Sequence, residues 1–203
     1  TARSFSDREA ALRLAVDGLA AGREVVLVTV LSTYGSAPRR PGAIWVIVDP
    51  VADQPTMQGS ISGGCIEEDL LDWLGQHTPP GYRRPPVVRS YDGRDHPGLP
   101  CGGTLSVLVE WPRGVTDIEP ALVAIADRES VWRQVDLATG AVDWRATSQP
   151  LPEAPHCDER TLVVPFGPVW RLVIVGAGSV ADQLAPQAAT LGFEVIVCDP
   201  RAG

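Results

Sequence analysis

The apolar positions along the chain follow two periods, which predict a protein built from both strands and helices. Short continuous apolar runs between turn residues are typical of buried strands, whereas apolar residues three and four positions apart are typical of amphipathic helices. Capping-box patterns at residues 6–9 and 116–119 mark two helix starts. The predicted helices cover residues 6–21, 66–77 and 116–130, and the predicted strands cover residues 25–30, 44–48, 87–91, 104–111, 131–137, 141–146, 161–166, 171–175 and 194–198.

A break in this pattern divides the chain into two parts. Residues 147–159 contain three prolines without hydrophobic periodicity and read as a linker or long loop, after which residues 161–166 are expected to close the first domain's sheet. The predicted fold class is α/β: a mixed α+β N-terminal domain over residues 1–167, followed by an incomplete Rossmann-like β-α-β unit over residues 168–203.

The second part carries a dinucleotide fingerprint. A strand run leads into Gly176 and Gly178 in a G-x-G-x-x-A pattern, and the next strand ends at Asp199, about 20 residues further on. These residues are candidates for binding NAD(P) or FAD; the competing interpretation is a tight turn without a ligand. Because the chain stops after the second strand, we expect a truncated protein whose open sheet edge favours pairing, for example in a homodimer. Pro186 falls inside the predicted helix of this unit, where it removes one hydrogen bond.

Composition narrows the function classes. The 203 residues carry a net charge of −8, which argues against general binding to nucleic acids or anionic membranes, and no apolar stretch approaches the length of a membrane span. All 17 basic residues are arginine, which excludes a Walker-A loop, a pyridoxal Schiff base and a lysine nucleophile. Four cysteines without a C-x-x-C pair favour reduced thiols in a cytoplasmic protein over disulfides or structural zinc.

The strongest chemical signal is a glycine-rich loop at residues 59–67, which ends in Cys65 where a helix is predicted to begin. Glycines allow a backbone to curl around an anion, and free N–H groups at a helix start can bind it. Cys65 is therefore a candidate thiol for ligating a soft metal or carrying sulfur, although many cysteines are only small buried hydrophobes. Glu67 is explained by the helix dipole, with a general-base role as an alternative. The candidate cofactor-binding residues of this loop are Gly59, Ser60, Ser62, Gly63 and Gly64.

Two further loops carry candidate residues. Cys101 stands before Gly102 and Gly103, and its functional and structural interpretations are equally open. Arg39 lies in a proline-flanked turn, where it is either a solvated residue or a guanidinium that grips a phosphate. The remaining thiols, Cys157 in the linker and Cys198 inside a buried strand, are interpreted as incidental.

The order of these loops resembles a known family. A Gly-Ser-Ala-Pro-Arg segment at residues 35–39, the loop at residues 59–67, Cys101-Gly102-Gly103, a Gly-Ala-Gly turn and an Asp-Pro-Arg ending occur in the order found in the XdhC/CoxI family. Its members are accessory proteins for molybdenum hydroxylases such as xanthine dehydrogenase and carbon monoxide dehydrogenase. Cys65, Cys101 and Arg39 match the family's motifs, whereas Ser179 stands where members commonly carry histidine.

The resemblance implies a chaperone rather than an enzyme with steady turnover. It would bind the molybdenum cofactor, support its sulfuration with a cysteine desulfurase as sulfur donor, and deliver it to a hydroxylase such as xanthine dehydrogenase. Cys65 and Cys101 would handle the chemistry, with Cys65 as a possible molybdenum ligand. Two alternatives remain open: an oxidoreductase that uses NAD(P) or FAD on the Rossmann-like unit, and a scaffold that docks the hydroxylase and the sulfur donor. A distance below about 10 Å between the two sulfurs would favour one shared site, since residues in contact act as a unit.

Overall fold

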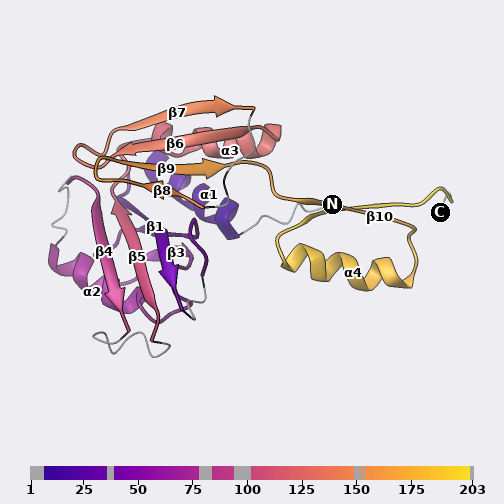
Figure 1. Ribbon diagram of the computed structural model, residues 1–203, viewed down its shortest axis with the longest axis horizontal. Coiled ribbons are helices and arrows are strands. Elements are labelled where there is room, and N and C mark those ends of the chain that lie inside the picture. Colours follow the sequence, from indigo (N-terminus) through magenta and orange to yellow (C-terminus); the bar gives the residue numbers. More distant parts are fainter. Residues whose placement is uncertain are drawn as a thin grey trace.

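A five-stranded antiparallel sheet forms the centre of the N-terminal region (Figure 1). The computed structural model describes residues 7–35, 39–77, 84–93, 102–148, 152 and 154–201. The strand order of the sheet is β3-β2-β1-β5-β4. Its strands are β1 (Val25–Tyr34), β2 (Ile44–Val48), β3 (Thr56–Gly59), β4 (Val87–Asp92) and β5 (Thr104–Glu110).

Both faces of this sheet are covered, which explains why β2 is apolar throughout and why Thr29 is the one polar residue between Val25 and Leu31 of β1. On one face, Val25 and Leu27 of β1 pack in a core with α1 (Asp7–Ala20) and α3 (Glu119–Asp127). On the other face, Val26 and Val28 pack with α2 (Glu67–His77), whose Leu70 is fully buried. Successive residues of β1 therefore enter different cores, as the two-residue period of a strand requires.

A second, four-stranded sheet packs across the core that contains α1 and α3. Its order is β7-β6-β9-β8, with β6 (Ser130–Asp136), β7 (Val142–Thr147), β8 (His156–Cys157) and β9 (Thr161–Phe166). A buried ion pair joins the two sheets: the Arg133 guanidinium of β6 lies 3.0 Å from the Glu110 carboxylate of β5. The strand predicted at residues 161–166 is present and pairs with β6 and β8. The expectation that it closes one sheet of the first domain is wrong, because it belongs to a sheet separate from the five-stranded one.

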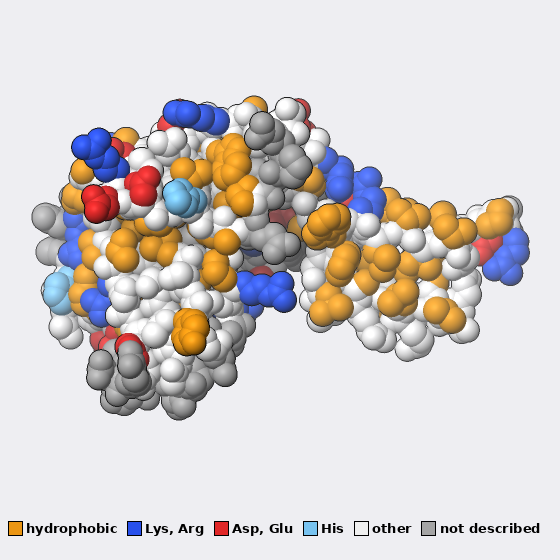
Figure 2. Space-filling model, in the orientation of Figure 1, with side chains coloured by type: hydrophobic (Ala, Val, Ile, Leu, Met, Phe, Trp, Pro, Cys, Tyr) orange, Lys and Arg blue, Asp and Glu red, His pale blue; other side chains and the backbone are white. Residues whose placement is uncertain are grey.

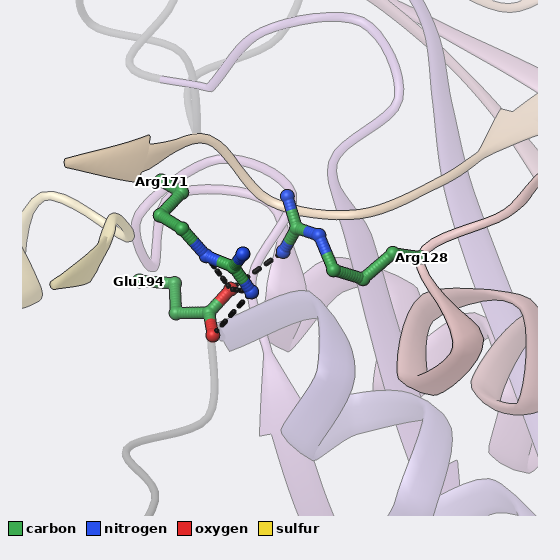
Figure 3. A network of polar contacts seen from close by, with 3 residues as sticks. All are labelled: Arg128, Arg171 and Glu194. Atoms are coloured by element: carbon green, nitrogen blue, oxygen red, sulfur yellow. Dashed lines mark hydrogen bonds and ion pairs between the residues drawn. The ribbon is translucent and has the colours of Figure 1, made fainter. Parts of the chain in front are cut away.

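The C-terminal unit, residues 170–201, is a parallel β-α-β unit of β10 (Arg171–Val175), α4 (Ser179–Thr190) and β11 (Glu194–Cys198). Within the unit, Glu194 pairs with Arg171 at 2.9 Å (Figure 3). Glu194 also ties the unit to the N-terminal region, because it pairs with Arg128, just after α3, at 2.5 Å. The mixed α/β fold class with a β-α-β unit at its end is therefore confirmed, whereas the domain boundary at residues 167/168 stays a prediction.

Many large apolar side chains of this unit are exposed (Figure 2). Val173 and Ile196 are neighbours on one face of the two-stranded sheet and are 53% and 38% exposed. Cys198 is exposed as well, so the expectation of a buried cysteine is wrong. Within the described part of the chain, α4 covers only one face of the two strands, which leaves the other face open.

Most predicted elements agree with the structure, and the differences are local. The edge strand β3 and the two-residue β8 were not predicted. The predicted capping box at residues 116–119 is wrong, because Thr116 lies in a 3-10 turn (Val115–Asp117) and Ile118 is the N-cap of α3, without a side-chain cap. The capping box predicted at residues 6–9 begins at Ser6, which lies outside the described residues.

Candidate functional site

Three glycine-rich loops leave the same end of the five-stranded sheet. Because β1 and β5 are antiparallel with Tyr34 opposite Thr104, the end of β1 meets the start of β5. Asp92 at the end of β4 is also opposite Thr104, and Gly59 at the end of β3 is opposite Trp45 near the start of β2. The strand register therefore brings together loops that lie more than 60 residues apart in sequence.

Gly59 begins the central loop in a conformation that only glycine adopts without strain. Its φ is +88°, and a Cβ added there would overlap the carbonyl oxygen of Ile44 on β2. That carbonyl accepts a hydrogen bond from the N–H of Ser60 at 3.1 Å. The close approach of the two backbones fixes the direction in which the loop leaves the sheet.

The loop curls around an anion, and that anion is the chain's own Glu67. One carboxylate oxygen accepts hydrogen bonds from the Ser60 hydroxyl at 2.7 Å and from the N–H groups of Ile61 and Ser62, both at 3.0 Å. The other accepts from the Ser62 hydroxyl and from the N–H groups of Gly64 at 3.0 Å and Ile66 at 3.2 Å. Most donors that the sequence predicted for a cofactor are therefore bonded to Glu67.

These contacts change the proton affinity of Glu67. Burial would raise its pKa, but the hydrogen bonds from the side chains of Ser60 and Ser62 and from the backbone of Ser62 and Ile61 outweigh that effect and hold the pKa at about 2. Glu67 is therefore ionised at neutral pH and fixed by its donors. This makes it a structural ligand of the loop rather than a group ready to accept a proton.

A cleft of about 540 Å³ opens beside this loop. Five predicted site residues line it: Arg39, Gly59, Ser60, Gly63 and Gly64. The other lining residues are Trp45, Met57, Gln58, Glu67 and Leu71. The Arg39 side chain is 40% exposed and lies 3.9 Å from the Asp7 carboxylate, a loose contact that leaves the guanidinium accessible from the cleft. The volume falls within the range of small-molecule sites.

The cysteines differ in exposure and in their surroundings. Cys65 is exposed in the loop just before α2, one residue after Gly64, so it is not a buried packing residue. Cys101 lies outside the described residues, and the shared site of two cysteines stays a prediction. Gly102 is exposed, whereas Gly103 is buried. Gly103 packs against Gly35: a Cβ added at Gly35 would lie 3.2 Å from the Cα of Gly103. Cys157 lies in β8, where burial and the neighbouring Asp158 raise the pKa of its thiol.

Ser62 contributes differently from the residues that line the cleft. Its side chain is 1% exposed, and its hydroxyl also accepts a hydrogen bond from the N–H of Ile66 at 2.8 Å. It therefore shapes the loop from inside. Sequence reasoning missed the role of Glu67, because Ser60 and Ser62 lie seven and five residues before it, whereas a capping box places the serine three residues before the glutamate.

The second candidate site lies in the C-terminal unit. Gly176 has a φ of +108°, and Gly178 is the N-cap of α4, with open space around both. Asp199, however, accepts a hydrogen bond from the Ala177 N–H at 2.7 Å and two from the Arg201 side chain, which together hold its pKa below the usual range. Nucleotide binding at these residues stays a prediction.

Neither a ready metal cage nor a membrane span is found in the described ranges. No group of three or more histidine, cysteine, aspartate or glutamate side chains gathers there as metal ligands would. Among the same residues, every helix is too short or too polar to cross a bilayer.

Comparisons with known proteins agree with this picture. The model of the XdhC and CoxI family matches residues 18–85, which include β1, β2, β3 and the loop around Glu67. The chain is 27% identical over 199 residues to the molybdenum cofactor insertion chaperone PaoD of Escherichia coli K12, covering 95% of this chain. It spans only 58% of that relative's length.

A solved structure has the same fold. The crystal structure of a protein described as a xanthine dehydrogenase, from Bacillus halodurans, superposes with a TM-score of 0.67 at 21% identity, over 97% of this chain and 63% of that one. The resemblance indicated by the glycine-rich loops is therefore confirmed: over residues 18–85 the chain matches the XdhC and CoxI family.

Proposed function

We propose that this chain binds the molybdenum cofactor in the cleft beside the Glu67 loop and acts as a chaperone rather than as an enzyme with steady turnover. The observation that carries the proposal is the cleft of about 540 Å³, which brings Arg39 together with Gly59, Ser60, Gly63 and Gly64. The residue after Gly64 is the exposed Cys65. The similarity to a molybdenum cofactor insertion chaperone supports it.

Arg39 and the glycines that line the cleft, together with Cys65 next to its lining residue Gly64, each suit one part of such a cargo. The Arg39 guanidinium is a planar donor that suits a phosphate group. The glycines have no side chains, so a flat ring system can approach their backbone closely. The Cys65 thiol, as a thiolate, is a soft ligand of the kind that molybdenum accepts. Glu67 keeps the loop folded while the cargo enters and leaves.

Cys65 also suits a role in sulfuration. Its thiolate would attack the outer sulfur of a persulfide on a donor such as a cysteine desulfurase; the donor's S–S bond breaks and the donor leaves as a thiolate. Cys65 then holds the persulfide, and no added oxidant is needed. The exposure of Cys65 supports this step, since a partner protein must reach the sulfur. The receiving enzyme would be a molybdenum hydroxylase such as xanthine dehydrogenase.

The test is to purify variants from a host that produces the cofactor and to measure bound molybdenum by mass spectrometry and bound pterin by fluorescence. Arg39→Gln should lower the bound pterin at least about tenfold, because a charged hydrogen-bond donor is lost. Arg23→Gln is the matched control, since Arg23 is similarly exposed but lies at the other end of β1, where it pairs with Asp49.

A second pair of variants isolates the thiol. Cys65→Ser should be purified without molybdenum, and its mass should not increase by one sulfur atom after incubation with a sulfur donor. Cys198→Ser should bind molybdenum and gain the sulfur atom, because Cys198 is an exposed thiol remote from the cleft in sequence. If the wild type carries neither molybdenum nor pterin, the proposal is wrong.

The NAD(P)- or FAD-dependent oxidoreductase remains the second candidate. The open space around Gly176 and Gly178 supports it, whereas the occupied Asp199 carboxylate weakens it. Calorimetric titration with NAD, NADP and FAD distinguishes the two functions, since micromolar affinity for one of them favours the oxidoreductase.

A further inference from the structure

A second cavity lies at the opposite end of the five-stranded sheet, where β5 ends at Glu110 and the chain continues through Trp111. Its volume is about 110 Å³. Its lining combines the proline-rich segment before β4, the end of β5 and the β6–β7 hairpin. The lining residues are Arg84, Pro85, Pro86, Glu110, Trp111, Pro112, Arg113, Arg133, Thr139, Gly140 and Val142.

The charge around this cavity opposes the charge of the chain as a whole. Three arginines and one carboxylate line it, whereas the protein carries a net charge of −8. The carboxylate, Glu110, already accepts hydrogen bonds from Nη1 of Arg133 at 3.0 and 3.2 Å. An excess of positive charge and of N–H donors therefore remains.

Arg133 is the deepest of the three arginines, with a side chain only 1% exposed. Its Nε donates to the carbonyl oxygen of Asp117 at 2.9 Å, and its Nη1 is bonded to Glu110. Its Nη2 has no hydrogen-bond partner within the described ranges. Buried charged donors are rarely left without an acceptor, so this atom is a donor available to a ligand of the cavity.

A second buried donor lines the same cavity. Trp111 is 9% exposed, and its indole Nε1 has no acceptor among the residues that the structure describes; the same holds for Nε of Arg84. The Arg84 guanidinium lies between the rings of Trp73 and Trp111, 4.7 Å from each centroid, and this stacking holds it in place.

The third arginine is fixed by the hairpin. The Arg113 Nη2 donates to the carbonyl oxygen of Thr139, and the following Gly140 has a φ of +72° and lies against Pro86. The cationic groups are thus held by packing and backbone contacts before any ligand arrives, which is the condition for a preorganised site.

We propose that this cavity binds a tetrahedral oxyanion, either free or as the terminal phosphate of a phosphate monoester. A water molecule must donate as well as accept hydrogen bonds, whereas the donors that lack partners here need only acceptors. An oxyanion offers acceptors in several directions and neutralises the excess positive charge. At about 30 Å³ per water, the volume has room for roughly three or four waters or one such ion. The site is separate from the cofactor cleft, since the two share no lining residue.

The test is calorimetric titration of the full chain with inorganic phosphate in chloride buffer at constant ionic strength. Wild type should bind one phosphate saturably. Trp111→Phe keeps an aromatic ring at this position but removes the indole N–H, and Arg113→Gln removes an exposed cationic group; each should weaken binding about tenfold or more. Arg145→Gln is the matched control, because it makes the same change in charge at an exposed β7 residue that does not line the cavity.

Phenyl phosphate in a second titration separates the two sources of the ligand. If phenyl phosphate binds as tightly as inorganic phosphate, the cavity accepts the terminal phosphate of a monoester. If phenyl phosphate does not bind, the cavity accepts only a free oxyanion. Thermal melting shows whether each variant is folded; Arg133 is left unchanged because its loss would leave Glu110 buried without a partner. The proposal is overturned if wild type shows no saturable binding, or if Arg145→Gln weakens binding as much as Trp111→Phe and Arg113→Gln.

Discussion

Replacing Glu67 by glutamine tests whether an internal carboxylate holds the glycine-rich loop. The neutral amide cannot accept all of the hydrogen bonds that the carboxylate receives from the loop, and one of its two ends becomes a donor that faces other donors. We expect Glu67→Gln to fold but to lose stability and loop order.

The magnitude follows from the pKa of Glu67. The fall from the ordinary value of 4.5 to about 2 corresponds to roughly 3 kcal/mol at 1.36 kcal/mol per unit. Because the carboxylate is half exposed, solvent screening reduces this to about 1–2 kcal/mol. The contribution is present above pH 4.5, where the unfolded chain is already ionised, and is lost as the pH falls from there through 2.

The assay is urea unfolding between pH 7 and pH 2.5, with Glu68→Gln as the control. Glu68 is an exposed neighbour in the same helical turn, so its replacement keeps the change in charge and the position along the helix dipole. Glu67→Gln should lower the free energy of unfolding by about 1–2 kcal/mol at pH 7, with a smaller difference at pH 2.5. Equal stability of Glu67→Gln and wild type at pH 7, with the same pH dependence, would refute the reasoning.

Three further changes test other parts of the structure. Gly59→Ala should lower the free energy of unfolding in urea by at least about 2 kcal/mol, because Gly59 has a positive φ and a Cβ there would overlap β2. The control Gly114→Ala should lower it by no more than about 0.5 kcal/mol, because Gly114 has an extended backbone and open space around it. Equal losses in the two variants would contradict the close approach of Gly59 to β2. Arg133→Met alone should lower the free energy of unfolding by about 3–5 kcal/mol, because it leaves Glu110 buried without its partner. Adding Glu110→Leu should restore most of this stability. No recovery in the double variant would show that the unpaired Glu110 is not the cause of the loss. Arg128→Ala should change the free energy of unfolding by less than about 1 kcal/mol yet increase deuterium exchange in β11, and unchanged exchange there would show that the ion pair does not hold the C-terminal unit.

Helices and strands were predictable where the pattern of their own apolar residues matches the way they are buried. Residues 25–30 and 44–48 were found as strands because both faces of β1 and β2 are buried, and α2 because its apolar stripe meets one core. The edge strand β3 was missed because its Thr56 and Met57 are exposed and give no alternation. Cys198 was expected to be buried because β11 is apolar, but burial depends on what covers a strand, which its own sequence does not state.

The shape of the glycine-rich loop was predictable from the sequence, but the group that it surrounds was not. Glycines and a helix start indicated a backbone that curls around an anion, and the loop curls around the Glu67 carboxylate. That the anion is Glu67, three residues beyond the last glycine, depends on a side chain folding back over its own helix start. The cavity around Arg133 could not be predicted at all, because β5, the β6–β7 hairpin and the segment before β4 meet only after folding.

The alternation along β1 has a consequence for how this protein can vary. Odd-numbered positions such as Leu27 pack in the core with α1 and α3, and even-numbered positions such as Val28 pack in the core with α2, which also contains Trp45 and Leu71 from the lining of the cleft beside the Glu67 loop. The strand therefore separates two sets of packing contacts. Side chains on the α2 side of the sheet can change while those that pack between the two sheets stay the same.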